Sequence, residues 1–240
     1  MRISALVAAF NTDRYVAAAI ESMLAQTVRA CEVIALDDGS TDNTVEVLRS
    51  FGDRIRVIEA PHRGAPAAFN AAVTAATGDV LAFNDADDLW APEKLAIQSQ
   101  HLANEPQLDA VFGAGQQFVS PDWESLENGA GMAAPQPAIG KIGMLIRRSA
   151  FERIGKFDPA FQFVDFVDWY ARAIKLGLRA RTFPEIVAFR RLHASNTGRV
   201  HRAEARAEYL LSLKRSLDLR RGRTPQQPTE RRWNGSRRTQ

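Results

Sequence analysis

Three aspartates, Asp85, Asp87 and Asp88, follow the short apolar run of residues 80–83. A run of that length and composition is typical of a buried strand. Because side chains alternate along an extended chain, Asp85 and Asp87 can point in the same direction. Carboxylates held this close repel one another unless a cation lies between them, and oxygen ligands suit the hard divalent ions that bind substrate phosphates. The spacing therefore indicates a strand end that holds a metal ion, which in turn holds a diphosphate.

A structural interpretation of the same residues stays open beside the chemical one. Asp88 could cap a helix whose first turn contains Pro92 and Glu93, since proline and acidic residues are favoured there. The two interpretations are compatible with each other.

The elements around these aspartates alternate between strand and helix throughout the first half of the chain. We expect strands at residues 3–9, 33–36, 55–58 and 80–83, and helices at 15–25, after Thr41 or Asp42, and at 67–76. This alternation predicts an α/β fold with a mostly parallel sheet and right-handed crossovers. In such sheets ligands bind beyond the carboxyl ends of the strands. Asn11, Asp38 and Asp85 each follow a strand, so three strands are expected to bring polar groups to one edge.

The second half of the chain is less regular. We expect a helix at residues 93–103, one bent strand or two short ones at 109–119, a strand at 141–147, a helix at 168–175, short strands at 178–183 and 186–191, and a last helix at 201–219. The loop-like residues 120–137 have the length of a lid, a binding loop or a disordered segment. After Gly222 the chain is polar, basic and rich in Pro and Gln, which predicts a disordered tail.

Composition is that of a soluble globular protein and argues against several classes of function. The 240 residues are 45% hydrophobic and 25% charged, and the net charge of +3 is too small to indicate a nucleic-acid binder. The single cysteine, Cys31, excludes an intrachain disulfide and fits a reducing compartment; we interpret it as a small core residue. The chain has no apolar stretch of the roughly 20 residues that a membrane helix needs, and no secretory signal, so we expect a cytoplasmic protein.

Four segments, in order, resemble the motifs of one enzyme family. They are the strand and helix that lead to AQT at residues 25–27, DDGSTD at 37–42, HRG at 62–64 with FN at 69–70, and FNDADDLW at 83–90 with PEKL at 92–95. On these motifs the chain resembles the family 2 glycosyltransferases, which are nucleotide-sugar-dependent enzymes with the Rossmann-like GT-A fold. The resemblance implies one GT-A domain at residues 1–221, with a nucleotide-sugar half at 1–105 and an acceptor half at 106–221, followed by the basic tail at 222–240.

The resemblance also implies roles on the nucleoside side of the site. Phe10 and Asn11 would lie near the nucleobase, Asp38 would accept a hydrogen bond from it, and Arg63 would lie near the base or the diphosphate. The family often has Pro-Thr-Tyr or Pro-Val-Tyr where residues 8–10 are Ala-Ala-Phe. A hydroxyl that could contact the nucleotide is missing there, so the preference for a base stays open.

The metal and the diphosphate are assigned in the same way. Asp85 would contact the ribose and the cation, and Asp87 would be the protein's ligand for Mn²⁺ or Mg²⁺. The cation would neutralise the diphosphate as it leaves. His193 resembles the histidine of the family's RRH segment, which would approach the diphosphate or the metal, although an isolated histidine is often structural.

An inverting transfer needs one carboxylate near the acceptor hydroxyl to take its proton. The family carries an acidic segment leading into a helix that a glycine closes, and here residues 165–169 lead to Gly177. Counting back from Gly177, Phe166 stands where the family has the aspartate usually assigned as the base. We choose Asp165 first and Asp168 second; Asp168 could instead cap a helix that begins at Trp169.

Two other classes of function stay in view. A nucleotidyltransferase would normally show a Gly-rich basic loop after the first strand, and residues 11–14 contain no glycine. A nucleotide-sugar binding module without catalysis is the other alternative, and Phe166 at the base position keeps it open. Trp90 and Trp169 could stack on a sugar or belong to the core.

The partners expected from this interpretation are a nucleoside-diphosphate sugar and an acceptor that is a glycan, a lipid-linked sugar, a peptide or a small molecule. Arginines of the last helix and the tail could also make peripheral contact with anionic lipid at the inner membrane face, or they could simply form a solvated face.

Overall fold

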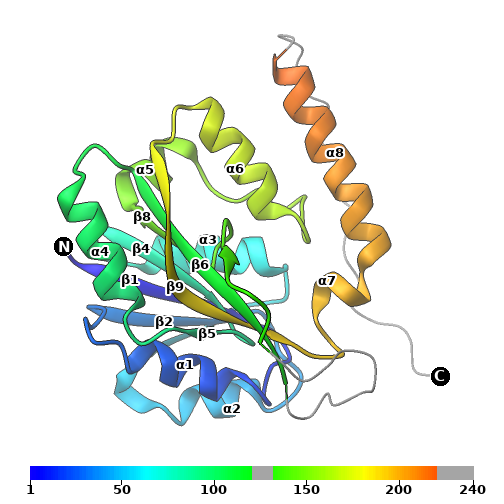
Figure 1. Ribbon diagram of the computed structural model, residues 1–240. Coiled ribbons are helices and arrows are strands. Elements are labelled where there is room, and N and C mark those ends of the chain that lie inside the picture. Colours follow the sequence, from blue (N-terminus) through cyan, green and yellow to red (C-terminus); the bar gives the residue numbers. More distant parts are fainter. Residues whose placement is uncertain (121–131, 221–240) are drawn as a thin grey trace.

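The computed structural model describes residues 1–120 and 132–220 of the chain. The expected loop at residues 120–137 lies partly outside the described residues, and the basic tail lies wholly outside them. Figure 1 shows a single curved sheet with helices on both of its faces.

The first four strands are parallel, as the alternation of the sequence predicts. β1 (Ile3–Ala9) lies between β2 (Glu32–Asp37) and β4 (Val80–Asp85), and β3 (Arg56–Glu59) extends the sheet beyond β2. Ala8 of β1 pairs with Leu36 on one side and with Asp85 on the other. The carboxyl ends of the three strands are therefore level with one another and share one edge.

The second half of the chain continues the same sheet with strands of both directions. β8 (Met144–Arg147) is antiparallel to β4, β6 (Ala110–Val119) is antiparallel to β8, and β9 (Ala180–Leu192) is parallel to β6. The short strands β5 (Leu89–Trp90) and β7 (Gln136–Pro137) pair with β9 and β6. The α/β class is confirmed, but these antiparallel pairs make the sheet as a whole mixed.

We expected two strands at residues 178–183 and 186–191, but the structure has one long strand, β9, which begins at Ala180 and runs through Pro184. Its register with β6 shifts between Phe112 and Gly115, opposite the proline. The irregularity lets the strand pass a residue that has no N–H to donate. The expected segment at 109–119 is correspondingly one strand, β6.

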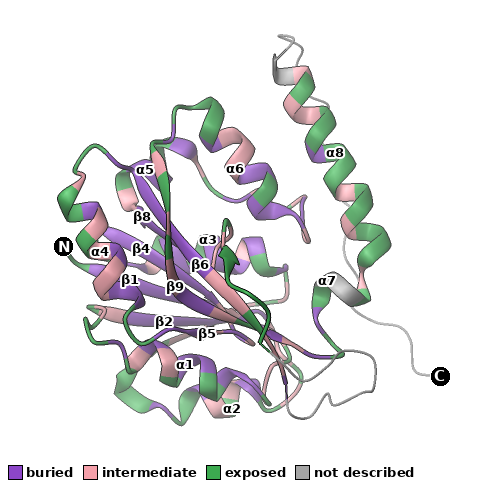
Figure 2. Cartoon of the chain, in the orientation of Figure 1, coloured by how far each residue is buried: buried purple, intermediate pink, exposed green. Residues whose placement is uncertain are grey.

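Alternating strand residues build two separate cores, one on each face of the sheet. On one face Leu6, Ile34 and Phe83 pack against α3 (Ala65–Ala75), α5 (Arg148–Ile154) and α6 (Asp165–Lys175). On the other face Ala5 and Val7 pack against α1 (Val16–Leu24), α2 (Thr44–Arg49) and α4 (Lys94–Asn104). The strands are mostly buried in Figure 2 for this reason. Trp90 and Trp169 are buried in these cores, which favours their core interpretation.

Three local expectations were wrong. Cys31 is exposed just before β2 and is not a core residue. Helix α6 begins at Asp165 after the N-cap Val164, so Asp168 lies inside the helix and does not cap it. Asp88 does not cap α4, whose N-cap is Glu93.

A 3₁₀ turn, η1 (Gly52–Arg54), follows α2. The last described elements are the helices α7 (Thr197–Val200) and α8 (Arg202–Arg220). Helix α8 lies beside α6 and projects from the body of the molecule (Figure 1). Within residues 1–120 and 132–220, no helix is both long enough and apolar enough to cross a membrane.

Candidate active site

The carboxyl ends of β1, β2 and β4 open into a cavity of about 350 Å³, which we call the first cavity. Of the residues predicted for the site, five line it: Phe10, Asp38, Asp85, Asp87 and Asp165. The other four lie outside its lining: Asn11, Arg63, Asp168 and His193.

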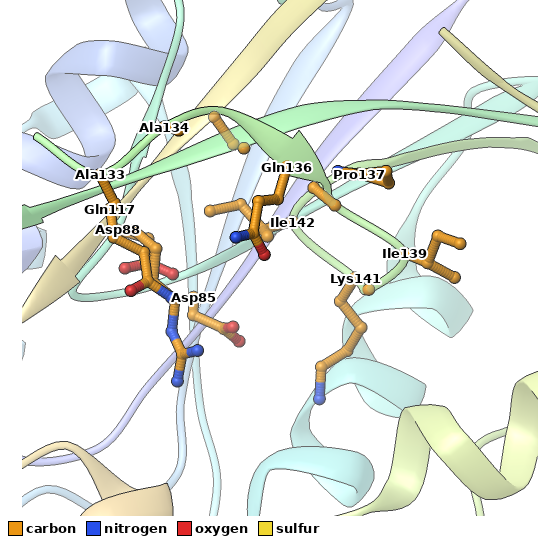
Figure 3. Close-up of a pocket in the computed structure, with 15 residues that line it drawn as sticks. Asp85, Asp88, Gln117, Ala133, Ala134, Gln136, Pro137, Ile139, Lys141 and Ile142 are labelled. Atoms are coloured by element: carbon orange, nitrogen blue, oxygen red, sulfur yellow. The ribbon is translucent and has the colours of Figure 1, made fainter. Parts of the chain in front are cut away.

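A second cavity of about 360 Å³ adjoins the first one and is bounded by β6, β7 and β9 (Figure 3). Asp85, Asp88, Lys141 and Arg190 line both cavities. Figure 3 shows Asp85 and Lys141 on the same open side of this volume, with the amides Gln117 and Gln136 around it. The four shared residues mark the junction, and it holds two carboxylates and two cations.

Asp85, Asp87 and Asp88 form an aspartate cluster whose carboxylates repel one another. Burial, followed by repulsion from Asp87 and Asp85, raises the pKa of Asp88 well above its ordinary value. Burial also raises the pKa of Asp85; Lys141 opposes this effect, whereas Asp87 and Asp165 add to it. Asp88 has a structural role as well, because its Oδ1 accepts the backbone N–H of Arg191 at 2.7 Å and so ties the cluster to β9.

The segment after β9 contacts one oxygen of the Asp87 carboxylate. Its Oδ2 lies 2.9 Å from Nε2 of His193 and accepts from Nδ2 of Asn196 at 3.2 Å. His193 is buried, and its Nδ1 lies 2.9 Å from Oγ of Ser195. This arrangement leaves the second oxygen of Asp87 outside these bonds. His193 therefore touches Asp87, the residue that the family resemblance implies as the metal ligand.

Asp38 organises the part of the first cavity that lies at the end of β2. Its Oδ1 accepts the backbone N–H of Arg63 at 2.9 Å, and its Oδ2 accepts that of Gly64 at 2.7 Å. Nδ1 of His62 lies 2.8 Å from the same Oδ2. The His62 ring stacks on Phe10 with centroids 3.9 Å apart and an interplanar angle of 22°. The two rings therefore form a flat apolar wall beside the carboxylate.

Asn11 and Arg63 support this region from outside the cavity. Asn11 has a positive φ of 51°, and its Oδ1 accepts the backbone N–H of Thr41 at 2.8 Å. That bond joins the end of β1 to the turn after β2. Arg63 is exposed, and the contact described above comes from its backbone.

The carboxylate of Asp165 lines the first cavity from the start of α6. Lys141 Nζ donates to its Oδ2 at 2.7 Å, and both side chains are mostly buried. Burial lowers the pKa of Lys141, but the carboxylates Asp165 and Asp85 outweigh it, so the pKa lies above its ordinary value. The ammonium of Lys141 therefore links Asp165 electrostatically to the aspartate cluster.

Phe166 and Asp168 point elsewhere. Phe166 packs edge to face against Phe112 and belongs to the core. Asp168 is buried and accepts from Nε of Arg172 at 3.0 Å, while Arg215 of α8 lies 3.6 Å away. Of the three residues at this end of α6, Asp165 is the one that lines the first cavity.

Several residues that shape the site were not singled out by the sequence. His62 stands inside the HRG motif, so its position carried a signal. The sequence carried no such signal for Lys141 or Asn196, because a single lysine and an asparagine after a strand are common on any surface. Their contacts depend on pairings between segments that lie far apart in the chain.

A buried lysine of α4 anchors the segment that carries Lys141. Nζ of Lys94 donates to the backbone oxygen of Ile142 at 2.8 Å and to Oε1 of Gln98 at 2.9 Å. Nε2 of Gln98 donates to the backbone oxygen of Gly143 at 2.7 Å. Burial lowers the pKa of Lys94 to about 7.

This pKa predicts how stability depends on pH. Below about pH 7 the folded protein carries a buried ammonium, and the free energy of burying that charge lowers its stability in full. Above about pH 7 the folded lysine loses its proton, while the unfolded lysine keeps its proton up to about pH 10.4. The unfolded state then binds more protons, so stability rises with pH. We expect the stability of Lys94→Met relative to the original protein to fall by roughly 2 kcal/mol between about pH 7 and about pH 9, measured by urea unfolding.

The control is Lys156→Met, which removes an exposed lysine and should give a difference that is independent of pH in that range. A Lys94→Met difference that also stays constant would show that Lys94 does not titrate there.

Comparison with known proteins places the chain among glycosyltransferases. Residues 4–155 match the family model described as Glycosyl transferase family 2. The chain is 34% identical to the uncharacterized glycosyltransferase alr2836 of Nostoc sp. over 218 residues, which cover 82% of this chain and 66% of that relative. It is 28% identical over 204 residues to the UDP-Glc:alpha-D-GlcNAc-diphosphoundecaprenol beta-1,3-glucosyltransferase WfaP of Escherichia coli, covering 81% of this chain and 78% of that one.

A similar solved structure is that of the mannosyltransferase PcManGT from Pyrobaculum calidifontis, in complex with GDP-Man and Mn²⁺. The TM-score is 0.64 at 21% identity, over 95% of this chain and 66% of that one. This likeness shows the shared GT-A fold. The segment that matches the family model begins in β1 and ends just after α5, so it contains Asp38, Asp85 and Asp87. The chain therefore belongs to glycosyl transferase family 2.

Proposed function

We propose that this glycosyltransferase moves a sugar from a nucleoside-diphosphate sugar to an acceptor hydroxyl, with a divalent cation and with inversion at the anomeric carbon. The observation that carries the proposal is the first cavity. It joins the flat wall of Phe10 and the carboxylate of Asp38, the aspartate cluster, and the carboxylate of Asp165 in one volume. The cavity thus offers a nucleotide the side chains of Phe10 and Asp38, a diphosphate the aspartate cluster, and the acceptor hydroxyl the carboxylate of Asp165.

The residues fit a cation that the diphosphate shares. Burial, and after it repulsion among the carboxylates, raises the pKa values of Asp85 and Asp88, and a bound cation would offset both effects. Asp87 and Asp85 are the residues that would hold it. Within the described ranges, three or more acidic, His or Cys side chains do not converge as a complete metal cage. Mg²⁺ and Mn²⁺ need only one or two carboxylates from the protein, because they complete their shell with phosphate and water. When bound, the ion would stabilise charge on the departing diphosphate.

The nucleoside is proposed to be uridine or thymidine. Oδ2 of Asp38 already receives Gly64 N–H and His62, but Oδ1 receives only Arg63 N–H among the described contacts. One lone pair of Oδ1 is left for the ring N–H that these bases offer. The two similar proteins differ in their nucleotide, because the name of WfaP specifies UDP-Glc and the structure of PcManGT holds GDP-Man.

A thermal-shift screen of nucleoside diphosphates, each with Mn²⁺ and with a chelator, tests this choice. Uridine and thymidine diphosphates are expected to raise the melting temperature in the presence of Mn²⁺, because a ligand that binds only the native state stabilises it by mass action. Guanosine diphosphate should give the smaller shift. Strong stabilisation by guanosine diphosphate and none by uridine diphosphate would overturn the assignment.

In the transfer reaction that we propose, Asp165 is the base. The acceptor oxygen forms a bond to the anomeric carbon as the bond from that carbon to the diphosphate oxygen breaks, and the bonding electrons leave with the diphosphate. The proton of the acceptor hydroxyl passes to Asp165. Lys141 orients this carboxylate through the 2.7 Å ion pair.

The acceptor is proposed only as a class, a hydroxyl of a glycan, lipid-linked sugar, peptide or small molecule, and a cytoplasmic location stays a prediction. A nucleotide-sugar binding module without turnover is the second candidate, because the ion pair with Lys141 engages one oxygen of Asp165. Release of free nucleoside diphosphate from a set of donors in the presence of mixed acceptors separates the two. Binding without any release, across donors that bind tightly, would favour the module.

A further inference from the structure

Helix α8 carries four of its large apolar residues on the side that faces away from the protein. Tyr209, Leu213 and Leu217 follow one another at intervals of four residues, and Leu210 lies beside them, so the four share one face. We call these four residues the outer stripe. Their exposed fractions are 45%, 44%, 49% and 59% in that order. Figure 2 shows the projecting helix largely in the colour of exposed residues.

The opposite side of α8 is polar and makes the contacts with the body. The carboxylate of Glu208 accepts the backbone N–H groups of Gln162 at 3.0 Å and Phe163 at 2.8 Å. Arg215 donates to Asp158 at 2.6 Å, and Ser212 is only 4% exposed. A surface helix normally buries its apolar face and exposes its polar one. In α8 the order is reversed, and polar bonds hold the helix so that the outer stripe faces outward.

Basic side chains lie along the outer stripe. Arg206 lies four residues before Leu210 and continues the line of the outer stripe toward the start of the helix, and Lys214 lies four residues after Leu210, at the edge of the stripe. Arg202 lies one turn before Arg206, and all three side chains are exposed. A helix that combines outward leucines with flanking cations matches an anionic lipid surface, where the leucines enter the headgroup boundary and the cations meet lipid phosphates.

We propose that the outer stripe of α8 is a docking surface for an anionic membrane, on which the helix lies in the plane of the headgroups. A second copy of this chain is the less suitable occupant, because Arg206 and Lys214 would be brought against the same cations of the copy. The proposal concerns α8 alone and is independent of the reaction proposed for the first cavity.

The test measures binding of the full chain to vesicles of phosphatidylcholine and of phosphatidylcholine mixed with phosphatidylglycerol. We expect binding to the mixed vesicles that weakens with added salt. The combined variant Leu210→Ser, Leu213→Ser and Leu217→Ser should lower the partition coefficient by at least about tenfold. The matched control is Leu211→Ser, since Leu211 is 50% exposed on the same helix but lies outside the stripe; it should bind like the original protein.

A second pair of variants tests the charges. Arg206→Glu should lower binding to the mixed vesicles by about tenfold, whereas Arg29→Glu, which makes the same charge change in the exposed loop before β2, should leave it nearly unchanged. The thermal shift with nucleoside diphosphate, recorded for each variant in solution, shows that it is folded and reports on the first cavity separately. Absence of binding to mixed vesicles, or equal binding by the stripe variant, the Arg206 variant and the original protein, would overturn the proposal. So would a dimer in sedimentation that the stripe variant dissociates without any vesicle binding.

Discussion

Replacing Asp87 with alanine is expected to remove the metal-dependent part of nucleoside-diphosphate binding while the fold survives. His193 and Asn196 hold one oxygen of Asp87 and fix the direction of the carboxylate. Loss of a group that merely orients a metal ligand typically costs about 10–100-fold in metal affinity, so loss of the ligand itself should cost about a hundredfold or more. Stability should change little, because removing one of several repelling carboxylates relieves part of the repulsion in the cluster.

Calorimetry with uridine diphosphate measures this effect. The affinity of Asp87→Ala in Mn²⁺ should equal that of the original protein in chelator. Asp53→Ala, which removes an exposed carboxylate from η1, is the control for the change in net charge. His193→Ala should give an intermediate loss of about 10–100-fold. An unchanged affinity of Asp87→Ala in Mn²⁺ would rule out Asp87 as the ligand.

The edge of the sheet at which the site forms could be predicted because its determinants are local. Each strand of the nucleotide half is a short apolar run, and each polar group follows its own strand directly. Parallel pairing then places Asp38 and Asp85 at one edge without further information. Four of the nine predicted site residues, Phe10, Asp38, Asp85 and Asp87, line the first cavity for this reason.

The rest depends on contacts that the sequence does not display. The position of His193 against Asp87 needs the pairing of β9 with β5 and β6, which joins residues more than a hundred positions apart. The start of α6 at Asp165 was missed because no side chain caps it. The reversed polarity of α8 was missed because its apolar spacing is that of an ordinary buried face, and only the tertiary contacts reveal which side faces the body.

Substitution of Asp165 by asparagine is expected to lower turnover by about 10²–10⁴-fold, the usual contribution of a positioned general base. Asparagine keeps the shape of the side chain and its place at the start of α6, but it cannot take the acceptor's proton. The affinity for the donor should stay nearly unchanged, because the nucleoside and diphosphate candidates lie at the ends of β1, β2 and β4. Loss of the carboxylate also leaves Lys141 without its charged partner, and the freed ammonium should not repel an anionic donor.

The matched control is Asp168→Asn, three residues along the same helix. Asp168 pairs with Arg172 and approaches Arg215, so its replacement should lower the free energy of unfolding by about 1–3 kcal/mol and leave turnover nearly intact. Both variants should be assayed with one donor and acceptor pair, beside urea unfolding. Loss of turnover in Asp168→Asn with activity kept in Asp165→Asn would reverse the assignment. Full activity in both would mean that neither carboxylate is the base and that the acceptor's proton leaves by way of another group or water.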